Sequence, residues 1–144
     1  MLPRVKATIS AMNGSDWAQL REQVAHVSAL LKKRYDGATL EQTLADVALL
    51  QRVLDDGVYD ATQLDEVRGL GAAFGNVVCK QLNFEWVAED DDRNREPVLR
   101  LKTNSKVVIN PMRTLVHQME SGDRIDLTSI YKSVQADVKR NSLI

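Results

Sequence analysis

The sequence predicts an α+β fold with N-terminal helices, a three-stranded antiparallel meander and two C-terminal helices. Three observations predict this class. Apolar residues recur at helical spacing up to about residue 83, the apolar period changes to two from Phe84, and helical spacing returns after Pro111. Because the 144 residues contain no internal repeat or low-complexity segment, we expect a single domain over 1–144.

The first expected helix covers residues 15–34 and is amphipathic. Ser15 suits its N-cap, and the basic residues at its other end complement the helix dipole. We expect His26, which lies between core positions, to be partly buried and hydrogen-bonded. The apolar stripe of this helix comprises Trp17, Leu20, Val24, Val27, Leu30 and Leu31.

Two more helices are expected before the sheet, and each begins with a capping box. Thr39 with Gln42 opens the first, which closes on Gly57, and Thr62 with Asp65 opens the second. The apolar stripe of the first comprises Leu40, Leu44, Val47, Leu50, Val53 and Leu54.

The glycine-rich stretch "GLGAAFG", residues 69–75, falls inside the second of these helices. A dinucleotide-binding loop needs its glycines between a strand and the start of a helix, where backbone N–H groups meet the pyrophosphate. Here the glycines follow a capped helical turn instead. Each interior glycine costs about 0.5–1 kcal/mol relative to alanine. We therefore expect Gly71, Ala72 and Gly75 to form a flat strip on which another helix or the sheet packs closely.

The remaining elements follow from residue 84 onward. "FEWVAED" and "PVLRLK" predict a β-hairpin with Asn94 in a left-handed turn position, and "KVVINP" predicts a third strand. Asn110 as N-cap and Pro111 as first residue open a helix that runs to Gly122. A final helix is expected over "DLTSIYKSVQADVKR", with its inward face formed by Leu127, Ile130, Val134 and Val138.

The sequence offers no recognised catalytic or metal-binding motif. Cys79, the single cysteine, lies in the apolar run "NVVC" and is read as a buried, unreactive thiol. His26 and His117 lie on different expected helices. The run "EDDD", residues 89–92, lacks the alternating ligands and central glycine of a calcium loop, so a solvated hairpin turn is the simpler interpretation. We predict no catalytic residue, no metal and no cofactor.

The location of the protein is predicted from what the sequence lacks. No apolar run approaches the roughly 18 residues that cross a bilayer. The N-terminal stretch also lacks the apolar segment of a secretory signal. These observations predict a cytoplasmic protein that does not associate with membranes.

Charge is distributed unevenly along the chain, although the net charge is only −1. Residues 41–92 carry twelve acidic and three basic side chains, whereas both flanking segments are basic. These acidic side chains either pair with basic ones in the fold or form a surface that attracts a basic partner. The candidate partner-binding residues are Asp55, Asp56, Asp60, Asp65, Glu66, Glu89, Asp90, Asp91 and Asp92.

Basic residues also cluster, on the expected hairpin. They are Arg93, Arg95, Arg100, Lys102 and Lys106. A pI of about 6.1 and the adjoining acidic residues argue against a surface that follows nucleic-acid phosphates.

Five short motifs carry a resemblance to a known family: "LLQRVLDDG", "LGAAFGNVV", "FEWVAEDD", "REPVLRLK" and "INPM". Through them the stretch 49–127 resembles a bacterial family of small domains of unknown function. Asn94 stands where a glycine commonly precedes the arginine of the family's Arg-x-Pro motif, here Arg95 to Pro97. The resemblance implies an α+β architecture and a bacterial origin, and it supplies no catalytic residues.

Two functional interpretations remain open at this point. The first is a non-enzymatic interaction module, for example an immunity protein that neutralises a basic toxin through its acidic surface. Small bacterial proteins of this general kind often have that role. The alternative is a small-ligand-binding or regulatory domain with a pocket between the sheet and the glycine-bearing helix, near Trp86, Phe74 and Gly71.

Overall fold

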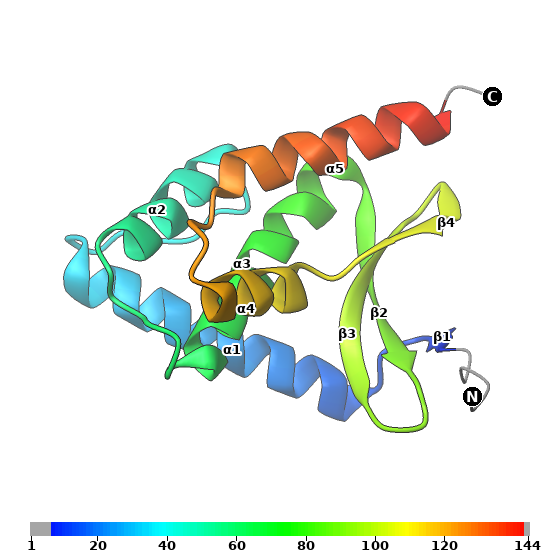
Figure 1. Ribbon diagram of the computed structural model, residues 1–144, viewed down its shortest axis with the longest axis horizontal. Helices are drawn as coiled ribbons and strands as arrows, with labels where there is room; N and C mark the ends of the chain where they lie inside the picture. Colours follow the sequence, from blue (N-terminus) through cyan, green and yellow to red (C-terminus); the bar gives the residue numbers. More distant parts are fainter. Residues whose placement is uncertain (1–6, 143–144) are drawn as a thin grey trace.

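A computed structural model describes residues 7–142 of the chain (Figure 1). This part of the chain contains five helices and four strands. Their order is β1 (Thr8–Ser10), α1 (Gly14–Arg34), α2 (Leu44–Asp55), α3 (Leu64–Leu82), β2 (Phe84–Asp90), β3 (Arg95–Leu101), β4 (Asn104–Ile109), α4 (Pro111–Ser121) and α5 (Leu127–Ser142). The predicted α+β class, the hairpin and the two C-terminal helices are confirmed.

The sheet is antiparallel and has the strand order β1-β2-β3-β4. Strands β2 and β3 pair along their full length, from Phe84 opposite Leu101 to Asp90 opposite Arg95. The predicted three-stranded meander therefore has a fourth strand at its edge. Strand β1 was not predicted because its three residues carry no periodicity of their own and gain their partners only from the end of β2.

Helix α3 is the centre of the fold. It contacts each of the other four helices and strands β2 and β3, and in Figure 1 it runs from the sheet through the middle of the helical part. Its own Phe74 is fully buried, and the core around it contains almost fully buried side chains from other elements, among them Phe84, Leu99 and Leu115. Such complete burial explains why α3 is apolar on nearly all sides over its second half.

The predicted close packing at the α3 glycines is confirmed, and each glycine meets a different element. A Cβ atom at Gly71 would lie 2.7 Å from Cα of Met112 in α4, and one at Gly75 would lie 2.4 Å from the Trp86 ring in β2. At Gly69 it would lie 3.2 Å from the backbone oxygen of Gln23 in α1. The three glycines thus let three elements approach the α3 backbone.

Helix starts differ from the predicted ones. Asn13, not Ser15, caps α1 and forms a capping box with Asp16. Helix α2 begins at Leu44, so the box predicted at Thr39 and Gln42 does not form. The preceding loop is held instead by Asp46, which is buried and accepts hydrogen bonds from the backbone N–H groups of residues 41 and 42.

Two further local predictions are wrong. Helix α3 has Gln63 as its N-cap without a side-chain cap, and Thr62 donates its hydroxyl hydrogen bond to Asp60. The left-handed position lies at Asn83, where α3 turns into β2, and not at Asn94. The hairpin turn is closed by Asp91, whose carboxylate accepts from the backbone N–H groups of residues 93 and 94.

The predicted helix start at Asn110 and Pro111 is confirmed, since the Asn110 side chain accepts from the N–H of Arg113. The predicted apolar stripes are correct except at their margins. Trp17 is 37% exposed and Leu44 is 55% exposed. Leu40 precedes α2 and is half-buried.

Candidate partner-binding groove

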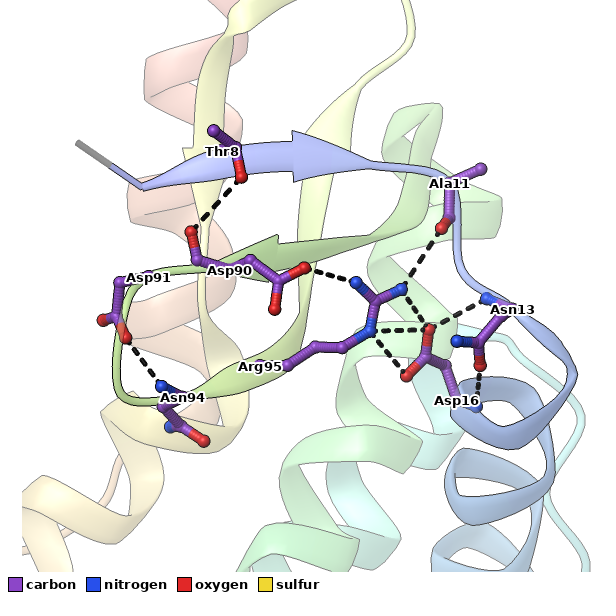
Figure 2. A network of polar contacts seen from close by, with 8 residues as sticks. All are labelled: Thr8, Ala11, Asn13, Asp16, Asp90, Asp91, Asn94 and Arg95. Atoms are coloured by element: carbon purple, nitrogen blue, oxygen red, sulfur yellow. Dashed lines mark hydrogen bonds and ion pairs between the residues drawn. The ribbon is translucent and has the colours of Figure 1, made fainter. Parts of the chain in front are cut away.

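Arg95 fixes the hairpin against the start of α1 (Figure 2). Its Nε and Nη2 atoms donate to the Asp16 carboxylate at 3.1 and 2.6 Å, and Nη1 donates to Asp90. Asp16 also accepts from the N–H of Asn13 at 2.8 Å. One carboxylate therefore caps α1 and binds the guanidinium, which sets the position of α1 relative to β2 and β3.

The same contacts shift the pKa values of both partners in the directions expected for an ion pair. The hydrogen bond from Arg95, followed by that from the Asn13 backbone, lowers the pKa of Asp16. The hydrogen bond to Asp16 raises the pKa of Arg95. The pair is therefore fully charged at neutral pH, and these charges are satisfied within the fold.

A groove lies between α1 and the first two turns of α3. Its first part, which we call the acidic compartment, has a volume of about 380 Å³. Tyr59, from the loop between α2 and α3, also lines it. The side chains that give this compartment its character are Glu22, Gln23, His26, Tyr59, Asp65 and Glu66.

Helical spacing explains how the acidic compartment is built. Glu22 and His26 are one turn apart on α1, and Asp65 and Glu66 occupy the first turn of α3. Gly69 allows the two helices to approach, because any side chain there would meet the α1 backbone and the Val27 side chain at 3.2 Å. The polar faces of α1 and α3 therefore stand beside one another above a closely packed floor.

The acidic compartment carries three carboxylates, those of Glu22, Asp65 and Glu66, and none of its lining residues is a lysine or arginine. Within residues 7–142, none of these three takes part in an ion pair. Burial, followed by the nearby Glu66 carboxylate, raises the pKa of Tyr59, which therefore stays a neutral hydroxyl at physiological pH. The compartment is suited to receive a cation.

A second compartment, of about 330 Å³, continues the groove toward the hairpin. It shares Gln19, Gln23 and Asp65 with the acidic compartment. We call it the arginine compartment, because its other lining residues include Arg68 and Arg95 together with Asn94, Glu96, Pro97 and Met112. Arg95 is engaged with Asp16 and Asp90, and Glu96 pairs with Arg113.

The nine acidic residues predicted to bind a partner lie in three places. Asp65 and Glu66 line the groove. Asp55, Asp56 and Asp60 lie at the end of α2 and in the loop after it, where Asp55 pairs with Arg124 at 3.4 Å, Asp56 accepts from the Tyr35 hydroxyl at 2.7 Å, and Asp60 accepts from Thr62. The hairpin carries the remaining four, Glu89, Asp90, Asp91 and Asp92.

Several residues of the groove were not among the predicted site residues. They are Gln19, Glu22, Gln23, His26, Tyr59 and Arg68. The available signal was the spacing of Gln19, Glu22, Gln23 and His26 along one face of α1. His26 differs from its prediction, because it is exposed and makes no hydrogen bond to any residue from 7 to 142.

Of the other sequence candidates, Arg95 lines the arginine compartment, whereas Trp86, Cys79 and Arg100 lie outside the groove. Trp86 is 8% exposed, closes against Gly75 and donates its indole N–H to Asn76 Oδ1 at 2.9 Å. Burial raises the pKa of the Cys79 thiol to about 12. Of the basic hairpin residues, Arg95 and Arg100 are engaged in ion pairs.

No group of three or more histidine, cysteine, aspartate or glutamate side chains between residues 7 and 142 is arranged to hold a metal ion. In the same part of the chain, none of the helices has the length and apolar character needed to cross a membrane.

Comparison with known proteins gives a family and a fold. Residues 46–131, more than half of the chain, match a family described as a domain of unknown function (DUF3806). None of the curated proteins matches the sequence. A crystal structure from Bacteroides thetaiotaomicron VPI-5482 is similar, with a TM-score of 0.81 and 20% sequence identity over 91% of this chain. The similarity covers 48% of that protein's chain, so the present chain spans about half of its length.

Proposed function

The chain belongs to this family of unknown function (DUF3806), and we propose that it is a non-enzymatic interaction module that binds a basic partner protein through the acidic compartment. The observation that supports this proposal is the presence of three carboxylates in the acidic compartment, whose lining contains no lysine or arginine. Most other carboxylates discussed above have a partner inside the fold. Those of Glu22, Asp65 and Glu66 are free to meet a charge from outside.

The geometry favours recognition of a lysine or arginine side chain. A groove of about 380 Å³ is large enough for one such side chain, and carboxylates from α1 and α3 flank it from two sides. Tyr59 adds an aromatic wall, against which the apolar stem of a lysine or the plane of a guanidinium can pack. Both walls are helices joined by a packed core, so the site needs little ordering before it binds.

The small energy of exposed ion pairs indicates what the acidic compartment contributes to binding. Exposed ion pairs contribute only about 0–1 kcal/mol each to affinity. Three carboxylates on one groove therefore act mainly by speeding association with a positively charged surface and by excluding acidic partners. The bulk of the affinity then comes from apolar contacts around the groove.

Exposed acidic side chains outside the groove support a more specific proposal about the partner. Asp60 and the hairpin acids Asp91 and Asp92 are exposed and form no ion pair among residues 7–142. They extend negative charge beyond the groove. We propose a cytoplasmic protein whose partner presents a broad basic surface, as a toxin neutralised by an immunity protein does.

The test compares a groove variant with a charge-matched control. The groove variant is Glu22→Gln, Asp65→Asn and Glu66→Gln. The control is Asp36→Asn, Glu120→Gln and Asp123→Asn, which removes three exposed carboxylates outside the groove. Cross-linked capture from the native cell, followed by purification of the captured protein, gives the partner for measurement of association rates.

We expect the groove variant to associate at least tenfold more slowly than the control and to show a weaker dependence on salt. Both variants should retain the thermal stability of the parent protein to within a few degrees. Equal association rates for the groove variant and the control would refute the proposal.

A further inference from the structure

Arg68 differs from the other arginines of the described structure. Six arginines form ion pairs with carboxylates. Arg21, Arg34 and Arg93 are exposed to solvent. Arg68 is half-buried and makes no hydrogen bond or ion pair with any residue from 7 to 142. It combines reduced hydration with the absence of an internal anion.

This combination indicates an external anion. A guanidinium is a fork of five donors that matches a carboxylate in a bidentate pair, and leaving such donors partly desolvated without an acceptor is unfavourable. Two other charges of the arginine compartment are already satisfied, because Arg95 binds Asp16 and Asp90, and Glu96 pairs with Arg113. Asp65, which this compartment shares with the acidic one, forms no ion pair with Arg68. Arg68 is thus the uncommitted cation of this compartment.

The two compartments carry opposite uncommitted charges, so the charge changes sign along the groove. Uncommitted carboxylates line one compartment, the uncommitted guanidinium of Arg68 lies in the other, and three shared residues join them. The side-chain amides of Gln19 and Gln23 line both compartments and that of Asn94 lines the arginine compartment, and none of the three makes a hydrogen bond among residues 7–142. Such amides have the donor and acceptor groups that pair with a peptide backbone.

We propose that the groove binds an extended peptide segment of its partner that carries both charges, with a basic side chain in the acidic compartment and a carboxylate on Arg68. This inference rests on the proposed function and specifies the segment that is recognised. The carboxylate belongs to an aspartate or glutamate side chain or to a free C-terminus. In either case the segment lies across the helices α1 and α3 and is read at two points of opposite charge.

A carboxylate fits the arginine compartment better than a phosphate. The Asp65 and Glu96 side chains line the same compartment. A phosphate with nearly two negative charges would meet more repulsion from them than a carboxylate with one. A carboxylate is planar and carries a single charge, so Arg68 alone can neutralise it.

The test uses synthetic peptides and the full chain. In the first arm a labelled, amidated peptide carries one lysine and one aspartate separated by one to four glycine or serine residues, and its aspartate is replaced by asparagine for comparison. In the second arm the peptide ends in a free carboxylate at the same distance from the lysine. A third arm carries phosphoserine in place of aspartate. Binding is measured by fluorescence anisotropy for the parent, Arg68→Gln and Arg68→Lys proteins.

We expect one spacing to bind best in either carboxylate arm. At that spacing Arg68→Gln should weaken binding of the carboxylate peptide about tenfold, and Arg68→Lys should weaken it less. Neither variant should change binding of the asparagine peptide. That coupling between protein and peptide charge separates a direct contact from a general loss of structure, and thermal unfolding of both variants provides a further check.

Three results would overturn the inference. If the carboxylate and asparagine peptides bind equally to the parent protein, no anion is recognised, whereas dependence on the lysine would leave the proposed function intact. If the phosphoserine peptide binds more tightly than both carboxylate peptides, the carboxylate assignment is wrong. If no peptide binds and the captured partner associates with the groove variant as fast as with the control, the inference and the proposed function both fail.

Discussion

The two halves of helix α3 differ in almost every respect. From Gly69 to Gly75 every residue is buried, and the helix meets α1, α4 and β2 at glycine positions. In its first two turns, Asp65 and Glu66 are exposed and Arg68 is half-buried at the wall of a groove. One continuous helix is therefore a structural element at one end and a recognition surface at the other.

This difference shows how a small fold can hold charged side chains at fixed positions on its surface. The buried half fixes the axis of α3 through contacts that leave no room for movement. The exposed half extends from that axis, so its charged side chains start from a rigid backbone. Substitutions in the two halves should consequently affect different properties, stability in one and binding in the other.

The largest effect is expected at the α3 glycines. Gly71→Ala or Gly75→Ala should lower the free energy of unfolding by about 2–3 kcal/mol, since overpacking costs more than the helix propensity of alanine returns. The new Cβ would lie 2.7 Å from the Met112 Cα or 2.4 Å from the Trp86 ring. Urea denaturation measures the change.

Gly14→Ala is the matched control, because no atom lies within 4 Å of a Cβ at that position. It should leave stability unchanged or raise it slightly. If Gly71→Ala and Gly75→Ala behave like Gly14→Ala, the second half of α3 is less tightly packed than its contacts imply.

A smaller loss is expected at Asn76. Asn76→Ala removes the acceptor for the Trp86 indole N–H and should cost about 1–2 kcal/mol, because the N–H donor of a buried tryptophan is left unpaired. Comparison with Trp86→Phe and the double variant isolates this hydrogen bond. The cost of Asn76→Ala should nearly disappear in the Trp86→Phe background, and an unchanged cost there would assign it to packing instead.

Asp16→Asn should cost about 1 kcal/mol at neutral pH, since it removes the charge that binds Arg95 and weakens the α1 capping box. Arg95 lowers the pKa of Asp16 below its ordinary value of 3.8. The stabilisation is therefore complete above that value and is lost as the pH falls through the lowered pKa.

Thermal unfolding from pH 7 to pH 2 tests this dependence. The difference between the parent and Asp16→Asn should be constant above about pH 5 and disappear in strong acid. Asp137→Asn, which breaks the exposed pair with Arg140 on α5, should change stability less. A difference between parent and Asp16→Asn that persists at pH 2 would contradict the ion-pair assignment.

The smallest effect on stability is expected in the first turn of α3. Glu66→Gln should change the free energy of unfolding by no more than about 0.5 kcal/mol, because the side chain is exposed. It should also lower the pKa of Tyr59, which the Glu66 charge helps to raise. NMR titration of the Tyr59 ring measures that shift. A loss above about 1 kcal/mol would make this half of α3 structural as well.

Much of the fold could be predicted from the sequence because its signals are local. The change of apolar period at Phe84 and the Asn110-Pro111 helix start act over a few residues. The glycines of α3 were placed inside a helix for the same reason. By contrast, strand β1 depends on a partner strand that is distant in sequence, and the start of α2 depends on a loop conformation, with the left-handed Gln42 beside buried Asp46.

The candidate groove could be predicted only in part. A count of charges along the chain found Asp65 and Glu66 because they belong to the acidic segment 41–92. It missed Glu22, which lies in the basic N-terminal segment, and Arg68, which is one of three basic residues in the acidic segment 41–92. Their importance arises when α1 and α3 pack together at Gly69, which lies more than 40 positions after its α1 contact Gln23. Charge counts record composition, whereas a groove is a property of the tertiary contact.

The contact between Arg95 and Asp16 also constrains the order of events during synthesis. The two residues are 79 positions apart, and β1 pairs with residues 88–90 of β2. While the ribosome is still translating the middle of the chain, α1 has its own capping box but β1 has no strand to pair with. Completion of this edge of the sheet therefore waits for the hairpin to emerge, and until then both sides of the segment 8–10 lack a strand partner and can be reached by chaperones or neighbouring chains.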